Sequence, residues 1–463
     1  GIEWLIVTFG AALAGVTVVS MNIRLGAKEL ADLVSRTSAR ALIYSADALG
    51  GRCVETLSAV DPTALASVES VFRVGTERRW VASGMDVVDF ADAMAGDLDA
   101  GPAELSHPDD PCLIIATSGT TGLSKLIVHL QGRVARHMSG IARAAGLDEP
   151  DTTNLVTMPF CGGYGYTLLM SAMAAGQTTV IADGFDAIGT ADLIRRHDVT
   201  HTGGTNDMLL NMLKADGRAD PFPSLRTYSH ANFTPSLIEM PAEAERRHVK
   251  IRGGYGLSEL LALVALQPID ADLDQRAQAG GVLVDDGASF RILDPDTGMT
   301  VVDGDVGEIQ IFTPNAMAGY LDDPAATAAT FTEDGYLRTG DLGRRLPDGR
   351  LNFDSRRHDV LRIGGYLVAP AEIEDLILAM EGIAACQVVA VNLRAGVRPV
   401  GFVVADSTFD EQAVIATCRD KLAKYKIPVR IFRIPEFPST DGPNGKKVKR
   451  NELRDMATQL LGN

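Results

Sequence analysis

A loop-forming stretch, Thr117-Ser118-Gly119-Thr120-Thr121-Gly122-Leu123-Ser124-Lys125, directly follows the apolar residues 113–116. Apart from Leu123 and Lys125, its residues are all small or carry a hydroxyl group. This composition is typical of a flexible loop whose backbone N–H groups, hydroxyls and single cation surround a polyphosphate. It is not a Walker P-loop, because Gly119 and Gly122 lie three residues apart and Lys125 follows Ser124 rather than a glycine. An ordinary Ser/Thr/Gly turn is the alternative interpretation. The loop alone does not distinguish a phosphate-binding loop from such a turn.

The composition and charge narrow the class of protein. The chain has 463 residues, of which 46% are apolar and 22% charged, as in a soluble globular protein of two or more domains. Acidic residues outnumber basic ones by 60 to 43, for a net charge of −17. Such a surface repels nucleic acid and anionic membranes, so no nucleic acid is expected as a partner. Any phosphate-bearing ligand must then be held by local groups.

The cysteines and an uncharged N-terminal stretch indicate where in the cell the protein is expected. Five widely spaced cysteines with no CxxC motif fit a reducing compartment, so we expect a cytoplasmic protein whose thiols are mostly buried. Residues 5–23 carry no charge, but Gly10 and Gly15 interrupt them. We therefore expect a buried helix that ends near Gly15, then a core strand, and no stable membrane insertion. Because Gly1 opens as if in the middle of a domain, we expect the usual first residues to be missing.

Strand-like and helix-like segments alternate in the first half of the chain. Apolar runs predict buried strands at 41–44, 113–116, 178–182 and 199–202, and the stretches between them predict helices at 28–38 and 165–175. This alternation indicates an α/β fold with a largely parallel sheet.

The pattern changes from about Gly280 to shorter strands separated by Asp/Gly turns, which predicts an antiparallel or β-barrel-like subdomain. After Asp354 a compact segment follows, with helices expected at 371–380 and 411–422 and strands at 387–391 and 400–404. We therefore predict two domains. Residues 1–355 form a large N-terminal domain of α/β sheet subdomains plus the β-barrel-like subdomain, and residues 356–463 form a small, mobile α+β C-terminal domain.

Four further segments carry residues suited to binding a nucleotide. Gly253-Gly254-Tyr255-Gly256-Leu257-Ser258-Glu259 combines an aromatic ring, which can stack on a base, with a carboxylate of the kind that holds Mg²⁺. Arg338-Thr339-Gly340-Asp341 places an acid beside a turn, which suits ribose hydroxyls. In Arg362-Ile363-Gly364-Gly365-Tyr366 the glycines let a thin ligand approach the backbone, and residues 444–454 form a lysine-rich loop. Each segment taken singly could be a solvated turn or loop.

In this order the five segments resemble those of the acyl-adenylate-forming superfamily, which includes acyl-CoA synthetases, aryl-CoA ligases, adenylation domains and luciferase. The resemblance covers essentially the whole chain and is closest to the acyl-CoA synthetases. It implies an ATP-dependent carboxylic acid–CoA ligase. Carboxylate and ATP would give an acyl-AMP and pyrophosphate, and the CoA thiol would then give acyl-CoA and AMP. The expected ligands are therefore ATP, Mg²⁺, coenzyme A and a small-molecule carboxylic acid.

The resemblance also implies roles for individual residues. Residues 117–125 are similar to the family's phosphate-binding loop, Glu259 matches its Mg²⁺ carboxylate, and Lys447 matches its adenylation lysine. Lys447 is chosen because it lies six residues before Leu453, although Lys446 after a glycine would be the more literal match. The remaining assignments are adenine (Ala231, Asn232, Gly254, Tyr255, Gly256 and Ser258), ribose (Asp341 and Arg356), the hinge (His358) and CoA (Arg362, Gly364, Gly365 and Tyr366).

Several residues depart from the family's pattern. Leu126 replaces a glycine after the loop lysine, and Gln131 replaces the second residue of a His-x-His pair, so that only His129 remains and is expected to be structural. Gly162, beside Cys161, stands where the family often has His or a bulky aromatic. Open space is expected at Gly162, Gly163, Gly203 and Gly204, and it favours a medium, long or bulky apolar acid. The acyl pocket is assigned to Cys161, Gly162, Tyr164, Gly204 and His230, with Cys161 as an apolar filler and His230 as either a substrate ligand or a structural residue.

These departures leave alternatives open. A thiolation-specialised relative would convert a preformed acyl-adenylate to acyl-CoA and would adenylate weakly or not at all. An adenylating enzyme could instead load an acyl carrier protein, and a non-catalytic nucleotide-binding protein is least favoured. The sequence does not distinguish a monomer from a homodimer.

Overall fold

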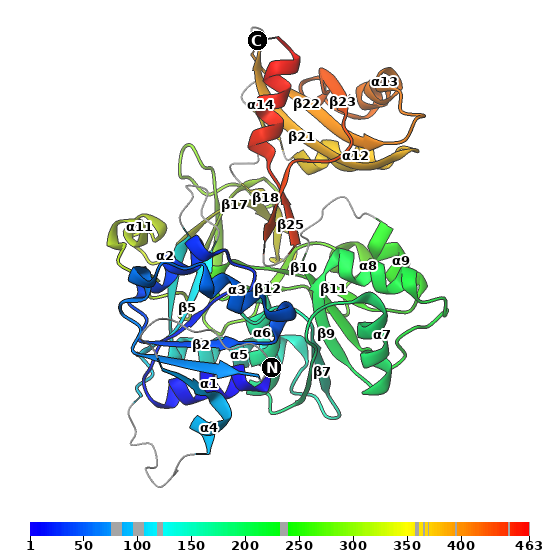
Figure 1. Ribbon diagram of the computed structural model, residues 1–463. Helices are drawn as coiled ribbons and strands as arrows, with labels where there is room; N and C mark the ends of the chain where they lie inside the picture. The colour runs from blue at the N-terminus through cyan, green and yellow to red at the C-terminus, as the bar shows by residue number, and fades with distance from the viewer. Residues whose placement is uncertain are drawn as a thin grey trace.

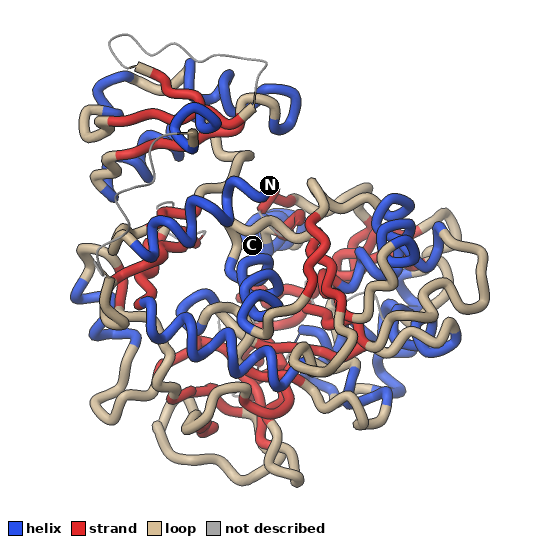
Figure 2. Tube along the Cα trace, turned by 90° about the horizontal axis from the view of Figure 1, so that it is seen from below, coloured by secondary structure: helices blue, strands red, loops and turns tan. Residues whose placement is uncertain are grey.

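The computed structural model describes residues 1–75, 86–95, 106–117, 124–231, 239–356, 361–363, 366–368, 370–393, 396–442 and 445–462. Figure 1 shows a large body and, above it, a small body that includes α12 (Pro370–Leu378). Viewed from below, strands fill the interior of the large body and helices lie around them (Figure 2).

The largest sheet has eleven strands in the order β14-β15-β17-β18-β13-β12-β11-β10-β9-β7-β8. The half from β11 to β8 is parallel, as the alternation of strands and helices predicts. β9 starts two residues after its predicted start at Val199, because the N–H of Val199 still bonds the carbonyl of Ile194 after the preceding helix. The strands of this half are β7 (Thr153–Val156), β8 (Thr178–Ile181), β9 (His201–Thr205), β10 (Thr227–Ala231) and β11 (Ile251–Tyr255).

Helices cover both faces of the parallel half. One face carries α5 (Gln131–Ala145) and α6 (Gly163–Ala174), and there Arg252 of β11 donates to the carbonyl of Ala144 at 3.0 Å. The other face carries α7 (Ala187–Arg196), α8 (Asn206–Ala215), α9 (Glu239–Arg246) and α10 (Leu273–Arg276), packed around a core that includes Tyr228. Because side chains alternate along a strand, odd-numbered residues of β9 and β10 face α5 and α6, and even-numbered ones face α7 to α10.

The other half of the sheet is antiparallel, as predicted, and it is joined to the parallel half through β12 and β13. β13 bonds to β12 on one side and to β18 on the other, which leaves β14 at the edge of the described sheet. Gly281 at this junction has a φ of 111°, and a Cβ there would lie 2.2 Å from the carbonyl of Leu266, so only glycine allows the approach. The strands are β12 (Ala265–Leu266), β13 (Gly280–Leu283), β14 (Ser289–Leu293), β15 (Gly307–Phe312), β17 (Leu337–Arg345) and β18 (Leu351–Arg356).

Two smaller sheets complete the large body. One consists of β1 (Val18–Ser20), β5 (Pro111–Thr117), β6 (Lys125–Leu130) and β16 (Gly319–Tyr320), and the other of β2 (Ala41–Ser45), β3 (Ser70–Val74) and β4 (Val87–Asp89). The helices of these parts of the chain are α1 (Ile2–Leu13), α2 (Ala27–Thr37), α3 (Arg52–Ser58), α4 (Phe90–Met94) and α11 (Pro324–Thr330). β2 and β5 contain the strands predicted at 41–44 and 113–116.

The N-terminal helix α1 is less buried than expected. It ends before Gly15 and the strand β1 follows, as predicted, yet only Leu5 and Thr8 of the helix are buried. Ile2 and Leu13 are 65% and 57% exposed. Apolar residues all round a helix give no sign of which side is covered, so the sequence overestimated the burial. In the described part of the chain, no helix has both the length and the apolar character needed to cross a membrane.

The small body has its own sheet and its own core. β21 (Ile383–Leu393), β22 (Gly396–Ala405) and β23 (Arg430–Arg433) form the sheet, and α12, α13 (Glu411–Lys421) and α14 (Arg450–Leu460) pack on it. Two hairpins accompany it, β19 (Leu361–Ile363) with β20 (Tyr366–Val368) and β24 (Ser439–Gly442) with β25 (Gly445–Val448). Figure 1 shows β25 extending from the small body toward the large one. All five cysteines are free, but fewer are buried than expected, because only Cys386 and Cys418 are fully covered.

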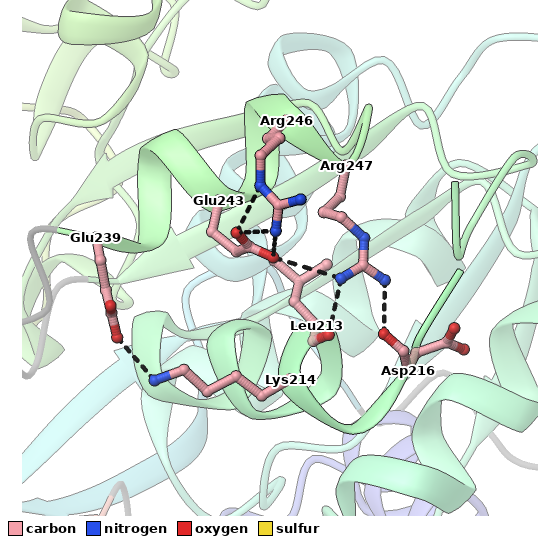
Figure 3. Close-up of polar contacts among 7 residues, drawn as sticks. All are labelled: Leu213, Lys214, Asp216, Glu239, Glu243, Arg246 and Arg247. Atoms are coloured by element: carbon pink, nitrogen blue, oxygen red, sulfur yellow. Dashed lines mark hydrogen bonds and ion pairs between the residues drawn. The ribbon is translucent and has the colours of Figure 1, made fainter. Parts of the chain in front are cut away.

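A buried arginine ties the end of α9 to the end of α8 (Figure 3). Arg247 is 7% exposed, and its guanidinium donates to the carbonyl oxygens of Leu213 at 3.1 Å and Asp216 at 2.7 Å. These carbonyls lie at the C-terminal end of α8, where the helix itself has no further N–H groups to offer. Glu243 accepts from Arg247 at 3.4 Å and also pairs with the exposed neighbour Arg246.

Arg247→Met is expected to lower the free energy of unfolding by about 2 kcal/mol, because it leaves buried carbonyl groups without donors. Arg246→Met removes a surface partner of the same Glu243 and is expected to cost less than about 0.5 kcal/mol. Urea unfolding followed by far-UV circular dichroism compares the two variants. Equal losses would show that the contacts of Arg247 at the helix end do not stabilise the fold.

Candidate active site

The strands β5 and β6 hold the two ends of the predicted phosphate loop. Thr117, the last residue of β5, pairs with Lys125, the first of β6. Arg36 of α2 donates to the carbonyl of Ser124 at 2.8 Å, so a helix distant in sequence anchors the exit of the loop. The predicted loop residues Ser118, Gly119, Thr120, Thr121 and Gly122 lie outside the described residues.

Lys125 and Glu259 meet at the side chain of a tyrosine. The hydroxyl of Tyr320, on β16, donates to Glu259 Oε1 at 2.8 Å. Lys125 Nζ lies 3.5 Å from the same hydroxyl and 4.5 Å from the centroid of the Tyr320 ring. A cation and a carboxylate therefore stand together at the mouth of the loop. Sequence reasoning missed Tyr320, which reaches this place because β16 pairs with β6.

A second carboxylate, Asp341, is buried where β11, β17 and β18 come together. It is 1% exposed, with Arg356 Nε 3.0 Å from Oδ1 and the Tyr255 hydroxyl donating to Oδ2 at 2.7 Å. Phe353 stacks on the Tyr255 ring, with the ring centroids 5.4 Å apart. Burial, and then the charge of Asp341, raise the pKa of Tyr255, so its hydroxyl keeps its proton. One residue predicted for adenine and both predicted for ribose thus form a single contact group.

The chain turns back sharply between Tyr255 and Val264. Leu261 and Ala262 have φ values of 52° and 69°, in the left-handed region that such residues rarely adopt. A Cβ on Gly256 would lie 1.3 Å from the carbonyl oxygen of Ala262, so glycine is needed there for packing. Strained backbone of this kind persists only where its surroundings over-determine it.

Buried side chains hold this turn from outside. His129 is 0% exposed, and its Nε2 lies 3.0 Å from the carbonyl of Ser258, directly before Glu259. Thr167 donates to the carbonyl of Leu261 at 2.7 Å. Burial lowers the pKa of His129 to about 3, so the ring is neutral and Nε2 is the donor. The expectation that His129 is structural is confirmed.

His129 is expected to make the fold less stable as the pH falls. Its pKa is about 3 in the folded protein against an ordinary 6.5, so below pH 6.5 the unfolded chain binds a proton that the folded chain excludes. About 2 kcal/mol of the stability present above pH 6.5 is then lost at pH 5. His129→Gln, whose amide can still donate to Ser258, should flatten the dependence of the unfolding free energy on pH between about 7 and 5. His107→Gln, at an exposed position, is the control. Identical slopes in the two variants would contradict the assignment.

The residues predicted for the acyl pocket do not share one face of the sheet. Tyr164 lies on the α6 side, where its hydroxyl donates to the carbonyl of Ser229 at 2.8 Å. His230 is at an even-numbered position of β10 and points to the opposite face. There His230 Nε2 lies 3.3 Å from the carbonyl of Arg276, and burial lowers the pKa of His230 to about 4. Of the two roles left open for His230, the structural one therefore agrees with these contacts.

The open space expected at Gly204 is absent. Gly204 faces the same side as His230, and a Cβ there would lie 2.5 Å from the Tyr228 hydroxyl. At the neighbouring Gly203, a Cβ would lie 3.1 Å from the Tyr164 hydroxyl. Both glycines therefore make room for tyrosine side chains of this chain rather than for a ligand.

An apolar cluster lies at the carboxyl ends of the parallel strands, the edge at which open α/β sheets bind ligands. Burial raises the pKa of the Cys161 thiol to about 11, which agrees with the expectation of an apolar filler. Gly162 caps the N-terminus of α6 beside this cluster. The buried members are Met158, Tyr164 and Met208, and Leu168, Phe185, Ala231 and Ala262 pack against them.

Comparison with known proteins identifies the family. The model of the AMP-binding enzyme family matches residues 1–321, which is more than half of the chain, and that of the AMP-binding enzyme C-terminal domain matches residues 372–446. The chain belongs to the AMP-binding enzyme family.

The relatives of this AMP-binding enzyme include named ligases. It is 29% identical to the 3-[(3aS,4S,7aS)-7a-methyl-1,5-dioxo-octahydro-1H-inden-4-yl]propanoyl:CoA ligase of Rhodococcus jostii (strain RHA1), over 98% of this chain and 86% of the relative. It is 30% identical to the ligase of the same name from Mycobacterium tuberculosis, over 98% of this chain and 87% of the relative. Its fold is similar to that of ATP-bound MatB from Rhodopseudomonas palustris, with a TM-score of 0.82 and 23% identity over 99% of this chain and 87% of that one.

In the small body of this AMP-binding enzyme, the predicted residues fall on the two hairpins. Arg362 is on β19 and Tyr366 on β20, with Tyr366 paired to Ile363. Lys447 is on β25, paired with Thr440 of β24. His358, Gly364 and Gly365 lie outside the described residues, as does Asn232 in the large body.

A buried ion pair anchors the end of the Lys447 hairpin. Arg450, the first residue of α14, donates to both oxygens of Glu374, at 2.9 and 3.1 Å, and to Gln387 Oε1 at 3.0 Å. Glu374 is 2% exposed and also accepts from the N–H of Val388 at 2.7 Å. Sequence reasoning missed this pair. The signal that could have indicated it is an acid three residues before Ile377, on the side of α12 where Ile373 and Ile377 are buried.

Proposed function

We propose that this chain is an ATP-dependent carboxylic acid–CoA ligase that works through an acyl-AMP intermediate. The observation that carries the proposal is the group at the mouth of the phosphate loop, where Lys125 and Glu259 meet at the Tyr320 hydroxyl. Membership of the AMP-binding enzyme family and similarity to relatives named propanoyl:CoA ligase support it.

The described residues fit ATP and Mg²⁺. Glu259 is only partly buried, so it can offer a carboxylate oxygen of the kind that Mg²⁺ prefers. Lys125 is exposed and can reach the β- and γ-phosphates, which residues 117–125 would surround. Asp341 and Arg356 would bind the ribose. The adenine would lie against Ala231, Asn232, Gly254, Tyr255, Gly256 and Ser258.

The first half-reaction joins the acid to the nucleotide. A carboxylate oxygen of the substrate attacks the α-phosphorus of ATP, the bond from that phosphorus to the bridging oxygen breaks, and pyrophosphate leaves. Glu259 would hold Mg²⁺, which would supply positive charge to the phosphates. Lys125 and Lys447 supply fixed positive charge to the phosphates, and such charge lowers the barrier most where negative charge develops. No proton has to be transferred, so the neutral and buried His129 needs no role beyond holding the Glu259 segment.

The second half-reaction transfers the acyl group to CoA. The CoA thiolate attacks the acyl carbonyl carbon, and AMP leaves with the electrons of the bond that linked it to the acyl group. Lys447 and the hairpin of Arg362 and Tyr366 both lie in the small body. A rotation of that body about a hinge at His358 would therefore replace the lysine by the CoA-binding hairpin, including Gly364 and Gly365. We place the domain boundary between residues 355 and 356, just before this hinge.

A bulky apolar acid is the proposed acyl substrate. The cluster of Met158, Tyr164 and Met208 offers an apolar lining, and unbranched methionine side chains can move to admit a large group. Gly162 adds space at the N-terminus of α6. The two similar ligases are named for a propanoyl group that carries an octahydroindenyl ring system, which agrees with a bulky acid.

Two assays test the proposed function. ATP–pyrophosphate exchange with a panel of acids reports the first half-reaction, and thioester formation from supplied acyl-AMP and CoA reports the second. We expect both with ring-bearing or long apolar acids and neither with short dicarboxylic acids. Thioester formation without exchange would favour a thiolation-specialised enzyme. Exchange without CoA thioester, but with loading of a carrier protein, would favour a carrier-loading enzyme.

A further inference from the structure

Tyr320 is fixed in place by packing and by backbone pairing. It is 8% exposed and packs with Ile127 and Met317. In the ladder of β16 with β6, Tyr320 pairs with Ile127, and its N–H donates to Thr327 Oγ1 at 2.9 Å. Because the ring is packed and its backbone is paired, the position of the Tyr320 hydroxyl is well defined.

The side chain of Tyr320 lies between two groups of opposite charge. Its hydroxyl is 2.8 Å from Glu259 Oε1 and 3.5 Å from Lys125 Nζ, and the ammonium also lies 4.5 Å from the centroid of the ring. Between these two described residues no direct ion pair within 4.0 Å is found.

We infer that Tyr320 is a positioning residue that keeps Lys125 and Glu259 from closing into an ion pair. The inference rests on the proposed function. In a direct ion pair, the Lys125 ammonium would be less available to bind a phosphate. One oxygen of Glu259 would also be less available to bind Mg²⁺. The hydroxyl offers Glu259 a neutral donor and the ring offers Lys125 a face that attracts cations, so each charge is held near the other without being neutralised.

Tyr320→Phe, written Y320F, tests this inference against a closely matched control. Tyr336 has a similar arrangement away from the site, with its hydroxyl 3.0 Å from Ser289 Oγ and the Arg291 guanidinium 4.1 Å from the ring centroid. Tyr336→Phe therefore removes the same atom from a similar setting. Three quantities are measured in both variants: the Mg²⁺ concentration at half-maximal exchange, the affinity for MgATP by calorimetry, and the rate of thioester formation from supplied acyl-AMP.

In Y320F we expect the Mg²⁺ requirement to rise and the MgATP affinity to fall by about tenfold, with thioester formation unchanged and Tyr336→Phe like wild type. A crystal structure of Y320F should show Lys125 and Glu259 in direct contact. Unchanged Mg²⁺ requirement and MgATP affinity in Y320F, or an equal loss in both half-reactions, would overturn the inference. If none of the acids supports pyrophosphate exchange by the wild-type protein, the proposed function is wrong. Calorimetry and the crystal structure still test the role of Tyr320 in that case.

Discussion

Lys447→Ala is expected to slow formation of the acyl-adenylate by about 10²- to 10³-fold and to leave thioester formation from supplied acyl-AMP nearly unchanged. Lys447 lies on β25, in the hairpin that extends from the small body toward the large one (Figure 1). Its ammonium would act on charge that develops during phosphoryl transfer, a step that supplied acyl-AMP bypasses. ATP–pyrophosphate exchange and a thioester assay measure the two half-reactions separately.

Lys446→Ala is the matched control for Lys447. The two lysines are neighbours on β25, where Lys446 pairs with Asp441 and Lys447 with Thr440. We expect Lys446→Ala to keep exchange activity. The reverse result would move the role to Lys446, the more literal match to the family's motif. Equal loss of both half-reactions in Lys447→Ala would contradict a role limited to adenylation.

Arg450→Met is expected to lower the free energy of unfolding of the small body by about 3–5 kcal/mol, because it leaves Glu374 buried without its cation. Glu374 is 2% exposed and takes two of its hydrogen bonds from Arg450. Adenylation should fall as well, because Arg450 is only three residues after Lys447, at the start of α14. Denaturant unfolding and pyrophosphate exchange provide the two measurements.

Two further variants separate the ion pair from general effects of α14. Arg454→Met, one turn along the helix, removes an arginine whose contact is to the exposed Asn451, and it should change stability by less than about 0.5 kcal/mol. Glu374→Gln combined with Arg450→Met should be more stable than Arg450→Met, because no unpaired charge stays buried. If the double variant is as unstable as the single one, the loss comes from packing and not from the stranded carboxylate.

Local patterns predicted much of this protein. The Ser/Thr/Gly loop ending at Lys125, the carboxylate at Glu259 and the lysines near the C-terminus indicated the family that the comparisons confirm. The parallel half of the sheet could be read from alternating strands and helices. These features depend on residues close together in sequence: a loop needs small residues, and a strand or a helix shows its own period.

Other predictions were incomplete because they concerned contacts between distant segments. Glycine at position 204 suggested open space, yet the Tyr228 hydroxyl fills it. His230 and Tyr164 were assigned to one pocket, yet Tyr164 of α6 covers one face of the sheet and His230, at an even-numbered position of β10, points to the other. The antiparallel pairing after Gly280 was expected, but the sequence did not indicate that β13 would join these strands to the parallel half.

The sequence by itself determined the family, the α/β class and the residue types that surround the phosphate loop. Only the tertiary structure decided that Tyr320, 195 residues from Lys125 and 61 from Glu259, stands between these two charges. It also decided that Arg450 is held by Glu374, 76 residues away. The physical reason is that spacing along the chain sets local conformation, whereas strand register and helix packing set which distant side chains meet.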